Sequence, residues 1–316
     1  MSSYNKDSAF AIDLATLSVG YFIKVKQFSI LPHTLRFVMV YFALLVLASC
    51  SMHKIIVKNL NWVVMREVNA YFNLSDEQYK YYREKGRGHL DWFKRTQIPW
   101  IIAELTKIQQ AKDPLPSEYL TTIAQERVPK LWIALADRLA EDGARLFRSL
   151  NAEQFDHFEK KLVEDSEVFS KLAALPPKEY IKEFHNLQKD SIDKMSDWVG
   201  DLTDEQKIKF RELTFVEQSQ YQKETAIWIE IRKEFVRQVK LKAASNGDVA
   251  KFLRHWARHP DIEGEKYQQY RKWRLSRQIA LWAEMEKTIT PKQRAFRTKR
   301  MTELINDLKT MEATQY

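Results

Sequence analysis

The sequence predicts an all-α protein, an irregular bundle of helical hairpins with long helices and no sheet. Charged residues make up 29% of the chain and aromatic residues 12%, while there are only 7 glycines, a balance that favours helices over sheets. Apolar residues recur at helical spacing, as in Leu131, Leu135 and Leu139, and no segment alternates like a strand over a useful length. A helix-start signature also occurs four times.

In this signature a capping residue is preceded by Leu or Ile and followed three positions later by Gln. The capping side chain can accept a hydrogen bond from the backbone N–H of the Gln, whose side chain reaches back, forming a capping box. The four pairs are Ser75 with Gln78, Asn151 with Gln154, Thr203 with Gln206, and Thr290 with Gln293. Their uneven spacing excludes a solenoid, which keeps a fixed period. Helix nucleation alone is sufficient to explain the signature.

The first two helices are expected before and after Ser75. Apolar spacing from Leu60 onward predicts one helix, and the capping box at Ser75 predicts the start of the next. Pro99 lies in strongly helical sequence and is expected to kink or split that helix. The prolines in 113–117 predict a turn.

Turn residues divide the remainder of the chain. The start at Asn151 predicts a helix to about Ala174, and the prolines that follow end it and begin another, which Gly200 terminates. The start at Thr203 predicts one long helix to about Ala244. A stop follows in 245–248, and the last start precedes a helix with Pro291 at its first position, where proline is preferred.

The stretch Phe37–Ser51 has a different character. Eleven apolar residues run from Phe37 to Leu47, too few for a spanning helix of about 20 residues but typical of a signal-peptide core. The sequence Leu47-Ala48-Ser49-Cys50 that follows resembles a bacterial lipobox. We therefore expect cleavage before Cys50, a diacylglycerol on its sulfur, and palmitate among the acyl groups of this lipid anchor.

The expected domain organisation follows from this cleavage. Residues 1–49 are interpreted as an upstream extension plus a lipoprotein signal peptide, and residues 50–316 as the mature helical domain, either single or subdivided near residue 200. The first 36 residues fit poorly with a short charged leader. Either the true start lies near Leu35 or Met39, or the chain carries an unusually long leader.

The expected compartment is the periplasmic face of the bacterial outer membrane. Cys50 is the only cysteine, so no disulfide can form within the chain. Ser51 stands where an aspartate is the usual signal for inner-membrane retention. The formal charge of +9 favours anionic partners such as lipid head groups, lipopolysaccharide, peptidoglycan or acidic proteins. Nucleic acid is disfavoured by the compartment.

The sequence offers few candidates for chemistry. His255 and His259 are four residues apart and could face one metal ion, but there is no third ligand and no glutamate of a zinc-protease motif. No nucleophile elbow or glycine-rich phosphate loop occurs, and the acidic runs are typical of solvated helix faces. We expect no enzyme and no cofactor apart from the lipid on Cys50.

A basic segment with aromatic residues follows near the carboxyl end. Trp273 and Trp282 flank cations that could contact an anionic membrane surface, namely Arg271, Lys272, Arg274 and Arg277. An ordinary amphipathic helix with both tryptophans in the core explains the pattern equally.

Together, Cys50 and the motifs LSDEQ, HLDWFKRTQIP, LNAEQ, DWVGDLTDEQ and ITPKQR resemble a family of helical bacterial lipoproteins of unknown function. The resemblance covers the whole mature chain and implies no known activity. A more distant likeness is to the periplasmic proteins Spy and CpxP, whose L-T-x-x-Q motifs begin helices. It implies a chaperone or an envelope-stress protein.

Three functions are therefore open. The first is a lipid-anchored scaffold that binds an envelope protein, the second is a Spy-like chaperone for unfolded clients, and the third is an enzyme of unfamiliar type resting on His255 and His259. The anchor, the helix-rich body and the lack of a recognisable active site favour the first.

Overall fold

The computed structural model describes residues 52–111, 114–245, 247–258 and 264–313, of which 52–59, 264–267 and Arg271 are described by backbone alone. Within these ranges every regular element is helical, which confirms the predicted all-α fold. The helices are α2 (Met52–Phe72), α3 (Asp76–Gln110), α4 (Ser117–Thr122), a π-helical turn (Ile123–Arg127), α5 (Val128–Ser149), α6 (Ala152–Ala173), α7 (Pro177–Val199), α8 (Asp204–Thr214), α9 (Gln218–Ala244), α10 (Val249–Arg258), α11 (Gly264–Thr288) and α12 (Pro291–Ala313).

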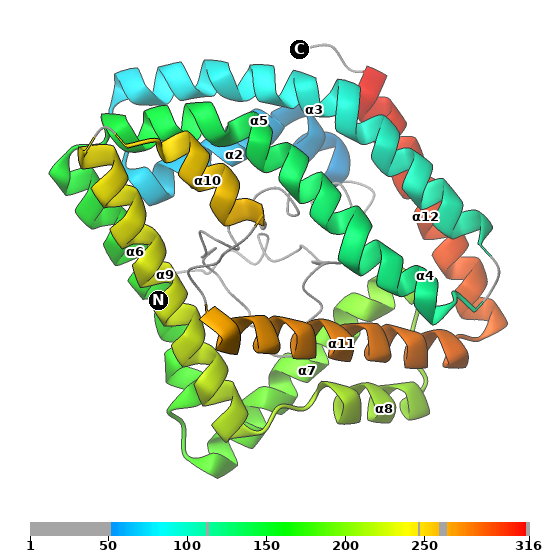
Figure 1. The fold of residues 1–316 in the computed structure, drawn as a ribbon. Coiled ribbons are helices and arrows are strands. Elements are labelled where there is room, and N and C mark those ends of the chain that lie inside the picture. The colour runs from blue at the N-terminus through cyan, green and yellow to red at the C-terminus, as the bar shows by residue number, and fades with distance from the viewer. Residues whose placement is uncertain (1–51, 112–113, 246, 259–263, 314–316) are drawn as a thin grey trace, which may run out of the picture.

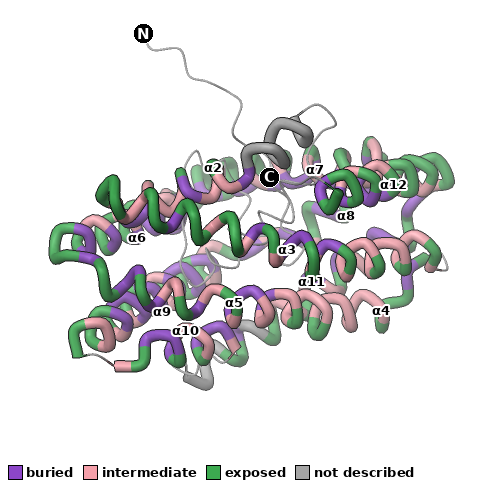
Figure 2. The backbone as a smooth tube through the Cα atoms, turned by 90° about the horizontal axis from the view of Figure 1, so that it is seen from above, coloured by how far each residue is buried: buried purple, intermediate pink, exposed green. Residues whose placement is uncertain are grey.

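The helices lie along the sides of a closed, roughly four-sided frame (Figure 1). Figure 2, turned by 90° from that view, shows that the frame is wider than it is deep. Helix α6 pairs with α9 on one side, α3 with α12 on another, and α11 packs against α4 and α8 on a third. The first and last described helices, α2 and α12, also contact each other, which closes the frame.

Two opposite corners of this frame are built from the four capping boxes. At the first corner, the starts of α3 and α6 face each other (Figure 1). Gln78 Nε2 donates to Ser149 O (2.9 Å), and Gln154 Nε2 donates to Asn73 O (2.9 Å) and to Gln78 Oε1 (2.7 Å). Each glutamine amide therefore completes its own capping box and also binds the neighbouring helix connection.

The second corner, where α8 and α12 start, repeats this arrangement. Gln206 Nε2 donates to Thr288 O (2.8 Å) and Gln293 Oε1 (3.0 Å), while Gln293 Nε2 donates to Asp201 O (2.8 Å) and Gln206 Oε1 (2.8 Å). In both corners the accepting carbonyl lies two residues before the partner's capping residue. The signature thus joins two helix connections in addition to starting a helix, so nucleation does not account for it fully.

The prediction of one long helix from Thr203 to about Ala244 is wrong. Helix α8 ends at Thr214, and α9 begins at Gln218. Phe215, the C-cap of α8, is extended, and buried Val216 packs in a cluster with α7. The carbonyl groups freed at the break are bound by side chains from elsewhere: Gln188 donates to Arg211 O, and Arg277 donates to Leu213 O and Phe215 O. These distant donors stabilise the break, which explains the absence of a local signal.

Pro99 lies within α3, which continues through it from Asp76 to Gln110. Figure 1 shows α3 changing direction along its length. The structure therefore contains the predicted kink and not the split, and the bend carries α3 around a corner of the frame. Gly200 ends α7 as predicted, with a positive φ of 82° that glycine adopts readily.

The largest apolar cluster joins α2, α3, α5, α6, α9 and α10, and Tyr270 of α11 belongs to it as well. Aromatic rings dominate it: Phe72 stacks on Phe158 with centroids 4.8 Å apart, and Phe147 contacts Phe158 edge-on at 5.7 Å. Close packing of these rings fixes the positions of the helices around them.

Candidate binding cavity

An apolar cavity of about 230 Å³ lies between α2, α3 and α5, with α9 and α10 closing it. Most of its wall consists of buried apolar side chains, which belong mainly to the largest cluster. These side chains include Met65, Tyr71, Phe72, Tyr82, Leu90, Phe93, Trp132, Leu135, Ala136, Ala140, Leu146, Phe147, Phe235 and Trp256.

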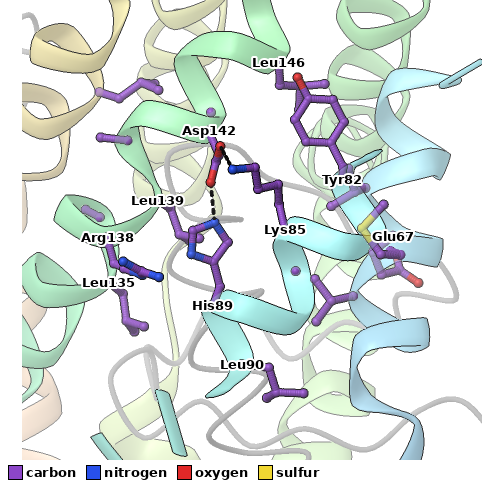
Figure 3. Close-up of a pocket in the computed structure, with 18 of the residues that line it drawn as sticks. Glu67, Tyr82, Lys85, His89, Leu90, Leu135, Arg138, Leu139, Asp142 and Leu146 are labelled. Atoms are coloured by element: carbon purple, nitrogen blue, oxygen red, sulfur yellow. Dashed lines mark hydrogen bonds and ion pairs between the residues drawn. The ribbon is translucent and has the colours of Figure 1, made fainter. Parts of the chain in front are cut away.

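Polar side chains gather in the wall where α3 faces α5 (Figure 3). His89 of α3 lies 2.9 Å, from its Nε2 atom, from Oδ2 of Asp142 on α5. Lys85, one turn before His89, places its Nζ atom 3.9 Å from Oδ1 of the same carboxylate. The His89–Asp142 pair therefore links the two helices across the cavity wall.

His89 is partly buried, with 17% of its side chain exposed against 44% for Lys85. Burial lowers the pKa of His89 below its ordinary value, and this effect outweighs the opposing influence of Asp142. The imidazole is therefore neutral near pH 7, with Nε2–H donating to Asp142. Its other nitrogen, Nδ1, is buried and has no hydrogen-bond partner among the described residues.

Two glycines inside helices allow the neighbouring helices to come close to this site. A Cβ atom on Gly86 of α3 would lie 2.4 Å from Oδ1 of Asn61, and one on Gly143 of α5 would lie 3.1 Å from Cδ1 of Leu253. All four residues line the cavity. The absent side chains let α2 approach α3 and let α10 approach α5, which fixes the helices that carry His89.

An open groove lies on the outer side of the same polar group. Five residues line both the cavity and the groove: Lys85, His89, Trp92, Arg138 and Asp142. The guanidinium of Arg138 lies 5.8 Å from the centre of the Trp92 ring. These five residues thus separate an apolar interior from a polar exterior.

The groove carboxylates of α5 other than Asp142 are paired with cations of α10. Arg258 donates to Asp137 (2.5 Å) and Arg254 donates to Glu141 (2.6 Å). These pairs neutralise the groove on the α5 side.

No pattern in the sequence singles out this site. His89 stands alone in its part of the sequence, because its partner Asp142 lies 53 residues away on another helix. The one available signal was glycine: Gly86 and Gly143 sit in helix interiors, where glycine is unfavourable and usually has a packing reason.

The predicted site residues lie elsewhere. Cys50 and His259 fall outside the described residues, and His255 is exposed on α10. Within the described ranges no group of three His, Cys, Asp or Glu could hold a metal ion. The proposed metal pair therefore gains no third ligand from that part of the chain.

The basic segment that contains Lys272, Arg274 and Arg277 lies on α11. These cations differ in their surroundings. Lys272 is exposed, whereas Arg274 lies over the Trp228 ring at 5.5 Å and Arg277 over the Trp273 ring at 4.9 Å. Arg277 also donates hydrogen bonds to Leu213 O and Phe215 O at the end of α8. Contact of this segment with an anionic surface stays a prediction.

Among the described helices, none combines the length and apolar character needed to cross a bilayer. A model of a family of unknown function, DUF6279, matches residues 70–251. This range contains His89, Asp142, Lys85 and Arg138. Comparison with curated proteins and with solved structures gave no significant match.

Proposed function

The chain belongs to DUF6279, a family of unknown function, and we propose from its own features that it is a non-enzymatic envelope protein whose apolar cavity is a binding site. The cavity between α2, α3 and α5 is the observation that carries this proposal. Pockets that bind small molecules are mostly apolar with a few placed polar groups, and this wall has that composition.

The size of the cavity sets the size of the ligand. An engineered apolar cavity of about 150 Å³ in another protein binds benzene. At about 230 Å³ the present cavity has room for a larger apolar group, such as a short alkyl chain. Burial of that group would supply about 0.8 kcal/mol for each methylene removed from water.

The composition of the wall favours binding over acyl-transfer catalysis. A His–Asp pair activates a neighbouring hydroxyl or thiol in hydrolases. Among the described residues that line this cavity there is no Ser, Thr or Cys. The His89–Asp142 pair is therefore assigned a structural and polar role at the edge of the cavity.

The distribution of exposed apolar residues favours the cavity over an open chaperone surface. A Spy-like chaperone would present a continuous apolar face to its clients. The most exposed large apolar side chains of the described residues lie one to a helix on eight helices: Trp62, Tyr81, Val163, Ile181, Ile208, Leu241, Trp273 and Phe296.

We further propose that the protein is attached by a lipid on Cys50 to the outer membrane and faces the periplasm, where it also binds an envelope protein partner. The lipobox-like sequence before Cys50 and the serine after it support this location. Labelled palmitate should be incorporated into the wild type and not into Cys50→Ser. Sedimentation of the wild type with inner-membrane markers on a density gradient would contradict the outer-membrane assignment.

The cavity proposal is tested with 1-octanol, a neutral eight-carbon probe, and the purified protein. Binding is followed by calorimetry and by NMR shifts. We expect Ala140→Leu, which adds three carbons at the cavity wall, to reduce binding at least about tenfold, since it removes the space for several methylenes. Ala280→Leu makes the same change at an exposed position of α11 and should bind like the wild type.

Circular dichroism on both variants reports whether they fold. If Ala140→Leu is unfolded, Ala136→Leu replaces it, because Ala136 lines the same cavity. Failure of the wild type to bind octanol would overturn the cavity proposal. Equal binding by wild type and a folded cavity-filling variant would do the same.

A further inference from the structure

We infer that the ligand is a single-chain amphiphile with an anionic head group, held so that the head contacts Lys85 and Arg138 and the chain enters the cavity. This inference rests on the proposed function and adds the chemical class of the ligand. It is carried by the position and the charge of the residues between the cavity and the groove.

The cavity and the groove share part of their wall. Because Lys85, His89, Trp92, Arg138 and Asp142 line both hollows, a ligand that enters the cavity from the groove must pass this set. Beyond it the cavity wall is mostly apolar, and its polar members are Asn61 and Glu67, the latter paired with Arg66. On the groove side most of the lining residues are polar. A molecule that matches both sides has an apolar chain and a polar head.

The residues between the groove and the cavity leave cations, and not carboxylates, available to a ligand. Asp137 and Glu141 are neutralised by Arg258 and Arg254, and Asp142 accepts the hydrogen bond from His89. On the α3 side, Glu84 pairs with Arg87 (3.3 Å). The acidic groups of the groove therefore all have partners.

Lys85 and Arg138 are the cations that a head group could reach. The Lys85 side chain is 44% exposed, and its 3.9 Å separation from Asp142 is the loosest contact of that carboxylate. Arg138 is exposed, and within the described residues no carboxylate lies within ion-pair distance of it. A guanidinium can bind a carboxylate or phosphate through two parallel hydrogen bonds.

His89 does not add to the positive charge of the passage. Because burial lowers its pKa, the imidazole is neutral near pH 7. Recognition of an anion therefore depends on Lys85 and Arg138. His89 keeps α3 and α5 at a fixed separation through Asp142.

The test compares four probes that share an eight-carbon chain: octanoate, octyl phosphate, 1-octanol and octylammonium. Calorimetry on the purified protein near neutral pH measures their affinities below the concentrations at which they form micelles. We expect the anions to bind about tenfold more tightly than octanol, and octylammonium to bind more weakly than octanol. Whichever anion binds more tightly identifies the head group as carboxylate or phosphate, and both results support the inference.

Two double variants test the assignment to Lys85 and Arg138. In Lys85→Met with Arg138→Met, octanoate should lose its advantage and bind no more tightly than octanol binds to the same variant. In the control, Lys80→Met with Arg83→Met, two exposed cations of α3 outside both hollows are removed. The control should retain the preference for the anions.

The outcomes separate this inference from the proposed function. If no probe binds, the cavity is not a binding site and both proposals fail. If octanol binds and the anions bind no more tightly, the cavity proposal stands and the amphiphile inference is overturned. Tighter binding of octylammonium, or loss of the anion preference in the control variant, would also overturn the inference.

Discussion

Replacement of Gln206 by Met tests whether the capping-box glutamines join the corners of the frame or only start helices. Gln206 is 2% exposed, and its amide bonds with Thr288 O, with Gln293 and with the backbone N–H of Thr203. The substitution keeps the apolar bulk of the side chain and removes all of these hydrogen bonds. It leaves the amide of Gln293 and the N–H of Thr203 without these partners.

The expected cost follows from the number of bonds and the burial. Each lost hydrogen bond contributes about 1 kcal/mol, and a buried polar group left without a partner costs about 1 to 3 kcal/mol, so we expect a loss of about 3 kcal/mol. Gln78→Met at the other corner should cost only about 1 kcal/mol, because Gln78 is half-buried and water can replace its partner.

The assay is urea unfolding followed by circular dichroism, with the midpoint and slope fitted for each variant. Gln293→Met and the double variant complete a mutant cycle. Since the reciprocal bonds between Gln206 and Gln293 are lost in either single variant, the double variant should cost about 2 kcal/mol less than the sum of the singles. Gln238→Met, which removes a single bond to Glu234 in the same helix, should cost a few tenths of a kcal/mol.

Additive costs in this cycle would refute the reasoning. If each glutamine only capped its own helix, the two changes would be independent, and each would cost about 1 kcal/mol. The coupling, and not the size of either single effect, is therefore the decisive quantity.

Three further predictions concern ionisation and backbone conformation. Burial raises the pKa of Asp165 from 3.8 to about 6, so the folded state binds the proton more tightly than the unfolded state and stability falls as pH rises from about 4 to about 6. Asp165→Asn, which keeps an acceptor for Tyr71, should remove this slope, which is worth about 3 kcal/mol; an unchanged pH profile of urea midpoints would contradict it. The NMR titration of His89 should have its midpoint below 6.5, and a midpoint above that value would show that Asp142 outweighs burial. Gly200→Ala should lower the free energy of unfolding by about 2 kcal/mol, because the backbone at Gly200, with φ 82° and ψ 175°, is restricted to glycine. Gly88→Ala, in open space within α3, should raise it by up to about 1 kcal/mol. Thermal unfolding of both variants tests this, and a higher thermal midpoint for Gly200→Ala than for Gly88→Ala would contradict it.

Local signals predicted the helix starts and stops well. The four capping boxes and the stop at Gly200 depend on residues a few positions apart, and their effects are expressed within one turn. Pro99 likewise acted within its own helix. The break between α8 and α9 had no such signal, because Gln188 and Arg277 supply its donors from distant helices.

The candidate site was hidden for the same physical reason. His89 and Asp142 become a pair only when α3 and α5 are placed side by side, and no periodicity in the sequence encodes that placement. The resemblance to a family of unknown function is confirmed, since the family model matches residues 70–251. The lipid anchor stays a prediction, because Cys50 lies outside the described residues.

Closure of the frame by its last helix has a consequence for how the chain folds over time. Helix α12 packs against α3, where Gln109 Nε2 donates to Oγ1 of Thr302 (2.7 Å) across 193 residues of sequence. Its buried Leu308 and Met311 complete a cluster with Leu60 and Leu90. A chain emerging from its amino end therefore keeps this apolar surface open to solvent until the final helix arrives. Because these contacts are long-range, we expect completion of the fold to be late and slow, and the nascent chain to be most prone to aggregate before α12 is made.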